Sequence, residues 1–203
     1  MPADNPPAAR QGFGQPWRER LPMPDAGAMN EQQRAAAQAL LDGPRKGVYG
    51  PFLPLLRSPQ LLDRVAKLGE YLRFDSMIDG RIRELVTCAA ARHVTNQFEW
   101  LMHVPLALKA GVSQQTLDAL RVGARPQQPA PDEAIALDFA NELMNAHGVS
   151  EPTYASAVAQ FGEQGVVELT TLVGYFVMVS WLMNVAHTPA QPSAGAALDA
   201  MPL

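Results

Sequence analysis

The chain has 203 residues, of which 47% are hydrophobic and 18% are charged, and its formal net charge is −4. This length and composition favour one compact domain with a sizeable core. The acidic balance and the absence of a Lys- and Arg-rich run argue against a nucleic-acid or membrane-surface partner. Cys88 is the only cysteine, which excludes an intrachain disulfide and a CxxC redox pair.

No segment of the sequence is expected to enter a membrane. Residues 1–24 lack an apolar stretch of the signal-peptide type. The apolar run at residues 166–185 is interrupted by Glu168, Gly174, Ser180 and Asn184. We therefore expect a cytoplasmic protein.

The chain divides into an arm, a helical domain and a tail. Residues 1–29 are rich in Pro, Gly, Ala, Arg and Gln without a sustained period, which predicts a flexible N-terminal arm. The helical domain is predicted at residues 30–188, and a Pro- and Ala-rich flexible tail follows at 189–203. Asn30 can cap a first helix that runs through residue 41.

A second helix is predicted from Pro59 to about Phe74. Apolar residues recur there at steps of three and four, which predicts a stripe that faces the core. The residues of this stripe are Leu61, Leu62, Val65, Leu68, Leu72 and Phe74.

Two further helices form the centre of the predicted domain. The first spans residues 81–93 and carries small residues suited to close packing. The second is capped by Thr95 or Asn96 and ends at Gly111. Pro105 removes one backbone donor inside this helix, which predicts a bend after Glu99.

The remaining elements are also predicted to be helical. Ser113 caps a short helix that ends near residue 122, and a proline-rich connector follows at 125–131. Helices are expected at 132–146, 151–161 and 165–186. The β-branched residues of 166–179 also suit a strand, but the length of this run favours a buried helix. The predicted fold class is therefore all-α.

The main chemical feature of the sequence is the pair Glu99 and His103. Residues four apart share one face of a helix, with Cβ atoms roughly 5 to 6 Å apart. Contact with a carboxylate raises the pKa of an imidazole and orients its ring, which suits a proton donor or acceptor near neutral pH. From spacing alone, a surface ion pair or a core histidine with satisfied hydrogen bonds is the more common interpretation.

The surrounding motif resembles a known family. Arg83-Glu84-Leu85-Val86 lies ahead of Phe98-Glu99-Trp100, which His103 and Pro105-Leu106-Ala107 follow. These residues are similar to the core signature of the carboxymuconolactone decarboxylase superfamily, most clearly over residues 59–122. The resemblance implies an alkylhydroperoxidase D-like orthogonal helical bundle. It also implies a homotrimer or homohexamer, and the apolar run at 166–185 offers more surface than one small core needs.

One branch of this superfamily uses a pair of cysteines. The alkylhydroperoxidase D motif resembles a glutamate, a CxxC pair and then a histidine, and Glu84 and His103 match its first and last positions. The two cysteine positions fall on Asn96 and Glu99, neither of which can act as a thiolate. We therefore do not expect a CxxC peroxidase. Cys88 lies outside the motif and is interpreted as core filling.

The decarboxylase branch resembles the chain without requiring the cysteine pair. It implies a cofactor-independent carboxy-lyase, or a related proton-transfer enzyme, that acts on a small carboxylated lactone or ring compound in aromatic compound catabolism. His103 is expected to donate a proton to the enolate left by loss of carbon dioxide, and Glu99 to hold its tautomer and charge. Glu84 is expected to carry a second proton or to position water.

Candidates for substrate binding lie near these residues. Arg83 flanks the motif, together with Arg81 and Arg92, and is the candidate for binding an anionic group. Tyr49, Phe52 and Trp100 are candidates for an apolar lining, although core packing is a common role for such residues.

Two other functions fit the same residues. In one, Glu84, Glu99 and His103 form the ligand set of a metal-binding enzyme, although no second histidine stands at ligand spacing. In the other, the chain is a non-catalytic oligomeric small-molecule-binding protein, and the motif only satisfies buried charge. In the leading interpretation no metal and no cofactor are expected.

Overall fold

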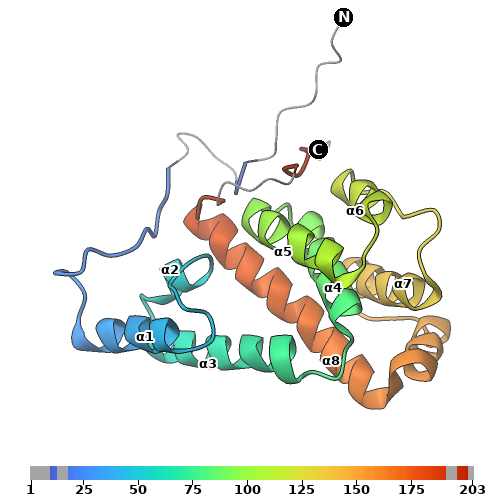
Figure 1. Cartoon of the computed structure of the whole chain (residues 1–203), viewed down its shortest axis with the longest axis horizontal. Helices are drawn as coiled ribbons and strands as arrows, with labels where there is room; N and C mark the ends of the chain where they lie inside the picture. The colour runs from blue at the N-terminus through green and yellow to red at the C-terminus, as the bar shows by residue number, and fades with distance from the viewer. Residues whose placement is uncertain (1–9, 13–17, 191–195, 201–203) are drawn as a thin grey trace, which may run out of the picture.

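The structure is a computed structural model that describes residues 10–12, 18–190 and 196–200 (Figure 1). Over these residues the chain forms α-helices, one π-helical turn and no β-strand, which confirms the predicted all-α class. The elements are α1 (Glu31–Asp42), α2 (Phe52–Leu55), α3 (Pro59–Glu70), η1 (Tyr71–Asp75), α4 (Gly80–His93), α5 (Gln97–Ala110), α6 (Gln114–Arg121), α7 (Pro131–Ala146) and α8 (Glu151–Ala186).

Side-chain caps account for several predicted helix starts. The Oδ1 atom of Asn30 accepts a hydrogen bond from the backbone N–H of Gln33, and the Oδ1 atom of Asn96 accepts one from Glu99, each at 2.9 Å. Ser113 caps α6 in the same way. These bonds satisfy donors that the first turn of a helix leaves unpaired, and the starts predicted after these residues are therefore confirmed.

Glycines mark two predicted helix ends. Gly111 ends α5 with a φ angle of 102°, in the left-handed region that glycine adopts without a steric cost. Gly162 breaks the long element α8, with φ and ψ angles of 71° and 172°. The break separates the two helices that were predicted on either side of it. The short helix α2 was not predicted.

Helix α8 is the axis of the fold. In Figure 1 it crosses the molecule diagonally, with α1 to α3 on one side and α4 to α7 on the other. One hydrophobic cluster packs α8 against α1 to α3 and α7, while a second cluster packs α4, α5 and α6. Helix α4 contributes to both clusters, with Val86 in the first and Leu85 in the second. Glu84, next to Leu85, lies where the two clusters meet.

The stripe predicted for residues 59–74, which form α3 and η1, is only partly correct. Leu62, Val65 and Leu72 are buried, but Leu61, Leu68 and Phe74 are 49%, 39% and 56% exposed. Helix α3 lies at the edge of the bundle and packs on one side only. Its buried stripe is therefore narrower than the apolar periodicity alone predicts.

Glu168 fixes the connection between α3 and α4. Its carboxylate accepts hydrogen bonds from Tyr71 and Ser76 at 2.6 Å and from the backbone N–H of Met77 at 2.8 Å. Burial opposes ionisation, but these bonds and one from Gln164 outweigh it and lower the pKa of Glu168 to about 2. The carboxylate therefore holds η1 against α8.

The predicted arm and tail lie partly outside the described residues, at 1–9, 13–17, 191–195 and 201–203. Their described parts contact the start of α5. The Oε1 atom of Gln11 accepts a hydrogen bond from the backbone N–H of Gln97 at 2.8 Å. The backbone of Leu198 exchanges two hydrogen bonds with the Gln97 side chain, each at 2.9 Å.

Candidate active site

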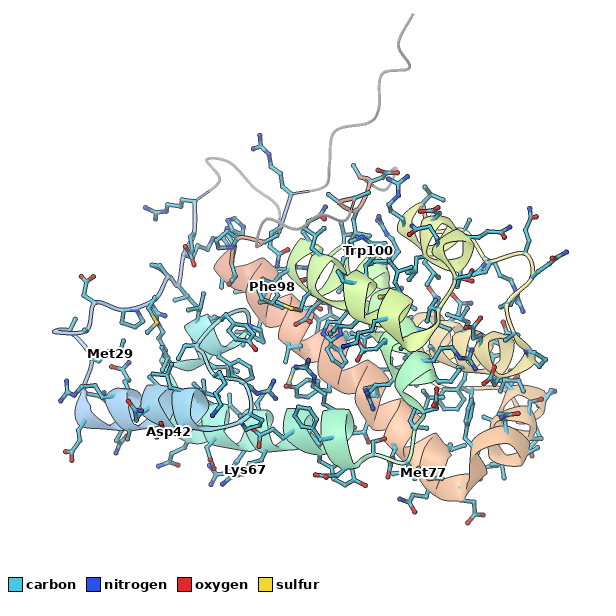
Figure 2. All side chains as sticks on the ribbon, in the orientation of Figure 1. Met29, Asp42, Lys67, Met77, Phe98 and Trp100 are labelled. Carbon is cyan, nitrogen blue, oxygen red and sulfur yellow. The ribbon has the colours of Figure 1, made fainter. Side chains whose placement is uncertain are left out.

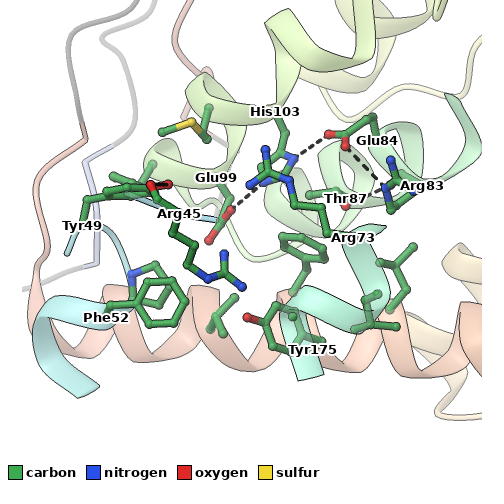
Figure 3. A pocket seen from close by; sticks show the side chains of 18 residues that line it. Arg45, Tyr49, Phe52, Arg73, Arg83, Glu84, Thr87, Glu99, His103 and Tyr175 are labelled. Atoms are coloured by element: carbon green, nitrogen blue, oxygen red, sulfur yellow. Dashed lines mark hydrogen bonds and ion pairs between the residues drawn. The ribbon is translucent and has the colours of Figure 1, made fainter. Parts of the chain in front are cut away.

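His103 lies between two carboxylates (Figure 3). Its Nδ1 atom is 2.6 Å from Oε2 of Glu84, and its Nε2 atom is 3.2 Å from Oε2 of Glu99. All three side chains are at least nine-tenths buried. The shorter contact therefore comes from Glu84 on α4, whereas the sequence had suggested Glu99 as the main partner.

This geometry favours a positively charged imidazole. Burial alone lowers the pKa of His103, but the hydrogen bonds and negative charges of Glu84 and Glu99 outweigh burial and raise it to about 9. For Glu84 the signs are reversed. Burial raises the pKa of this carboxyl group, but the hydrogen bond to His103 outweighs burial and lowers the pKa below its ordinary value. At neutral pH both ring nitrogens of His103 therefore carry protons: Nδ1 donates a hydrogen bond to Glu84, and Nε2 forms an ion pair with Glu99.

Local structure explains the position of Glu99. Asn96 caps α5, so Glu99 lies in the first helical turn, where unpaired N–H groups and the helix dipole favour a negative charge. Asn96 also donates hydrogen bonds to the backbone oxygen of Ser180 and to Oδ1 of Asn184, which ties the start of α5 to α8. One position that holds a cysteine in the related peroxidase motif is thus a buried helix cap in this chain.

Three arginines border the same pocket: Arg45, Arg73 and Arg83. Arg83 follows the polar start of α4, and its Nε atom is 3.6 Å from Oε1 of Glu84. Arg73 comes from the π-helical turn η1, which rotates it relative to a continuous α-helix. Arg45 comes from the loop between α1 and α2.

Arg45 is the most enclosed of the three, with a side chain that is 8% exposed. Its guanidinium carbon lies 4.6 Å from the centre of the Phe52 ring, and its Nη2 atom donates a hydrogen bond to the backbone oxygen of Ala66 at 3.2 Å. Its Nε atom has no hydrogen-bond partner among the described residues. Figure 3 shows the guanidinium pointing into the space between Glu99 and Tyr175.

Aromatic side chains form a large part of the remaining lining, around a cavity of about 90 Å³. The Phe176 ring packs edge-on against His103, with the ring centres 5.0 Å apart. Tyr175 is buried, and burial raises its pKa to about 12, so it stays a neutral hydroxyl at neutral pH. The other aromatic residues that line the cavity are Tyr49, Phe52 and Phe98.

The charges of the pocket do not cancel. Arg45, Arg73, Arg83 and protonated His103 face Glu84 and Glu99, with Glu70 3.9 Å from Arg45 at the rim. Cations thus outnumber carboxylates around a largely apolar space. Such a pocket favours a small anion with an apolar ring or chain.

The structure brings most of the predicted site residues together. Glu84, Glu99, His103 and Arg83 line one cavity, as do Tyr49 and Phe52. Arg81 and Arg92, the other arginines near the motif, are engaged elsewhere. Arg81 pairs with Asp132 and Glu133, while Arg92 donates a hydrogen bond to the backbone oxygen of Asp199.

Trp100 is a correction to the predicted substrate-binding set. Phe98 and Trp100 lie near the start of α5 (Figure 2), but only Phe98 reaches the cavity. Trp100 is buried in the second hydrophobic cluster, and its indole N–H donates a hydrogen bond to the backbone oxygen of Ala196 at 3.0 Å. Its role in this structure is to anchor the described part of the C-terminal tail.

Sequence reasoning missed several residues of the lining, among them Arg45, Arg73, Tyr175 and Phe176. Arg45 stands in an irregular loop that carries no periodic signal. Arg73 follows a helix at the point where the hydrogen-bond pattern changes. Tyr175 and Phe176 lie in a long apolar run, where nothing local distinguishes a pocket residue from a core residue.

The arrangement does not favour the metal-binding alternative. Glu84 and Glu99 contact opposite nitrogens of the ring, whereas metal ligands converge on one point. Among the described residues, no group of three His, Cys, Asp or Glu side chains is placed to hold a metal ion. Cys88 is fully buried, as expected for core filling, and burial raises the pKa of its thiol well above the ordinary value.

Gly69 keeps the floor of the pocket open. A Cβ atom at this position would overlap the Tyr175 hydroxyl and lie 2.8 Å from Nη2 of Arg45. We expect Gly69→Ala to lower the free energy of unfolding by about 1–3 kcal/mol, the usual cost of overpacking, in urea titrations. Gly148→Ala is the control, because no atom lies within 4 Å of its added Cβ. Equal stability of the two variants would contradict this packing.

Comparisons with known proteins agree with this fold. Residues 59–142 match the model of the carboxymuconolactone decarboxylase family, which confirms the predicted resemblance. No curated protein matches the chain.

Three solved structures share the fold. An uncharacterized peroxidase-related protein from Ralstonia eutropha, with an alkylhydroperoxidase AhpD core, has a TM-score of 0.69 at 18% identity and covers 85% of this chain and 92% of its own. A peroxidase-related protein from a Silicibacter species has a TM-score of 0.68 at 15% identity, covering 90% of this chain and 96% of its own. An AhpD-like protein from Agrobacterium tumefaciens has a TM-score of 0.61 at 17% identity, covering 68% and 96%.

Proposed function

We propose that this chain, whose residues 59–142 match the carboxymuconolactone decarboxylase family, is a lyase or related proton-transfer enzyme for a small carboxylated lactone or ring compound. The observation that carries the proposal is the buried His103 imidazolium, held between Glu84 and Glu99 beside a cation-rich cavity. A buried acid of this kind is a typical catalytic group.

The proposed reaction balances without an oxidant or a cofactor. The bond between the substrate carbon and its carboxylate breaks, carbon dioxide leaves, and the electron pair enters the conjugated carbonyl as an enolate. His103 then delivers a proton to carbon and becomes neutral. A proton from water restores the imidazolium, so each turnover consumes one proton.

The two glutamates have different roles in this proposal. Glu84 makes the shorter contact, so it holds the ring through Nδ1 and stabilises the imidazolium. The Nε2 contact to Glu99 is longer, so the Nε2 proton is the one transferred to substrate. After this transfer, Glu99 passes a new proton from water to the neutral Nε2 atom and so restores the imidazolium.

The arginines orient the substrate and stabilise charge. The buried Nε donor of Arg45 lies 3.9 Å from Oε1 of Glu70 and has no hydrogen bond to a described residue, so an anionic oxygen closer to it gains a charge-assisted hydrogen bond. Such a bond accelerates the reaction when it is stronger to the enolate than to the starting acid. The leaving carboxylate is best placed against the aromatic lining, where a charged group is less stable than neutral carbon dioxide.

Thiol peroxidase activity is not proposed, although two of the similar structures are called peroxidase-related. Cys88 is the only cysteine and is fully buried. A thiol with a raised pKa is a poor nucleophile because little thiolate is present near neutral pH.

The cytoplasmic location stays a prediction.

The proposal is tested by supplying a panel of lactone acids and β-keto acids in D₂O. We expect carbon dioxide release and one deuterium at the new C–H bond for each carbon dioxide formed. Arg45→Gln should lower kcat/KM by about 10- to 100-fold, which corresponds to one lost charge-assisted bond. Arg64→Gln, on the exposed face of α3, should leave kcat/KM unchanged.

Two outcomes would contradict the proposal. One is binding of the acids without release of carbon dioxide, which would favour the non-catalytic binder. The other is turnover of hydroperoxides by the wild-type protein with no activity on any acid in the panel.

A further inference from the structure

The outer face of α8 carries an apolar stripe that the described residues leave largely exposed. It consists of residues 167, 171, 174, 178, 181 and 185, which follow one another at alternating steps of four and three. Val167, Trp181 and Val185 are 65%, 59% and 60% exposed, and Met178 is 41% exposed. This spacing is the seam of a helix that packs lengthwise against another helix.

Two copies of the stripe are complementary in shape when their helices run antiparallel. Positions at equal distances before and after residue 176 then lie opposite each other on the two helices, and each such pair has side chains of compatible size. In an antiparallel pair of identical helices centred there, Val167 lies opposite Val185. Thr171 then meets Trp181, and Gly174 meets Met178. A small residue faces a large one in the two inner pairs, as close packing of helices requires.

Gly174 supports a close approach at this place. A Cβ atom added to Gly174 would have no atom within 4 Å, so packing against the described residues does not require a glycine here. Its absent side chain leaves a gap in the stripe that an opposing methionine fills. Glycine also weakens a helix interior by roughly 0.5–1 kcal/mol relative to alanine, so an external contact offers a reason for its presence.

Charge also favours a second copy. Glu168 is the only Asp, Glu, Lys or Arg between residues 164 and 188, and its carboxylate is buried under donors from η1 and the following turn. Tyr71 and Met77, which donate two of these bonds, are 41% and 51% exposed. One cation lies at the end of the stripe, where Arg20 donates a hydrogen bond to the backbone oxygen of Val185 at 3.0 Å. In an antiparallel pair the two Arg20 side chains lie at opposite ends, so the uncharged centre meets its copy without repulsion.

We propose that α8 pairs antiparallel with α8 of a second copy of this chain, about a two-fold axis near residue 176. Trp181 is the main anchor, because large aromatic residues dominate the energy of protein interfaces. A two-fold contact builds dimers and other even-numbered assemblies but not a simple three-fold ring. The opposite face of α8 carries Phe176 into the candidate active site.

The first experiment measures mass in solution by size-exclusion chromatography with light scattering. We expect the wild-type protein to have an even multiple of the 22.0 kDa chain mass. Trp181→Lys should halve this mass, since it places a charge in the seam. Val122→Lys, at a residue that is 50% exposed on the other side of the domain, should not change it.

Three results would overturn the proposal. They are an odd multiple for the wild type, including a monomer; an unchanged mass for Trp181→Lys; and flotation of a wild-type monomer with phosphatidylcholine vesicles. The last would assign the stripe to a membrane, for which α8 is long and apolar enough.

The second experiment tests whether the two α8 helices run antiparallel. It does not depend on the folding of the Trp181→Lys variant. Residues 167 and 185 of one helix are about 27 Å apart, too far for a disulfide within the chain. The double variant Val167→Cys/Val185→Cys, oxidised with glutathione disulfide, should form covalent dimers. Each single variant should stay monomeric on non-reducing gels, as should the wild type. Covalent dimers from a single variant would show parallel pairing, and their absence from the double variant would show no pairing; either overturns the proposal.

Discussion

His103→Gln is expected to lower turnover of the identified acid substrate by about 10²- to 10⁴-fold, the usual contribution of a positioned proton donor. The glutamine amide has a similar size and can donate a hydrogen bond to Glu84, but it cannot release a proton at accessible pH. The helical fold should therefore persist. Steady-state carbon dioxide release measures the loss, and circular dichroism checks the fold.

The matched control is His93→Gln, at an exposed histidine that ends α4. This variant should keep the activity of the wild type. If His103→Gln retained full activity as well, the assignment of His103 as the proton donor would be wrong, and the buried triad would have only a structural role.

The second large effect concerns pH and Glu84. The pKa of His103 is raised to about 9 in the folded protein, above the ordinary value of 6.5. Its contribution to stability is therefore complete below pH 6.5 and is lost as the pH rises through 9. The shift corresponds to about 3 kcal/mol, at roughly 1.4 kcal/mol for each pKa unit.

The pKa of Glu84 sets the lowest pH at which the ion pair with His103 stabilises the fold. Burial raises its pKa, but the bond to His103 outweighs burial and the pKa lies below the ordinary 4.5. This contribution is present above pH 4.5 and is lost as the pH falls through the lowered pKa. The ion pair should therefore stabilise the fold most between pH 4.5 and 6.5, which urea unfolding at a series of pH values would measure.

Glu84→Gln should move the alkaline limit of both stability and activity toward neutral pH. It removes the closer of the two negative charges, so the pKa of His103 falls toward its ordinary value while Glu99 still supports it. NMR titration of the imidazole protons measures this pKa directly. Asp63→Asn, in an exposed pair with Lys67, is the control and should move neither limit. An unchanged alkaline limit in Glu84→Gln would show that Glu84 does not control His103.

Local sequence determined most of the helices and one half of the site. Capping side chains such as Asn30, Asn96 and Ser113 act on N–H groups within three residues, so the neighbouring sequence suffices to place a helix start. The contact of Glu99 with His103 is equally local, because helix geometry puts residues four apart on one face.

Tertiary packing decided the other half. Glu84 is 19 positions from His103, and it meets the imidazole only because α4 and α5 pack with one particular rotation about their axes. The same rotation sends Phe98 to the cavity and Trp100 to the core, although both are aromatic residues of one helical turn. Arg45 and Phe176 arrive from a loop and from α8. Hydrophobic periodicity shows which face of a helix is buried, but not which neighbour that face will meet, because that depends on the fit of all the packed helices together.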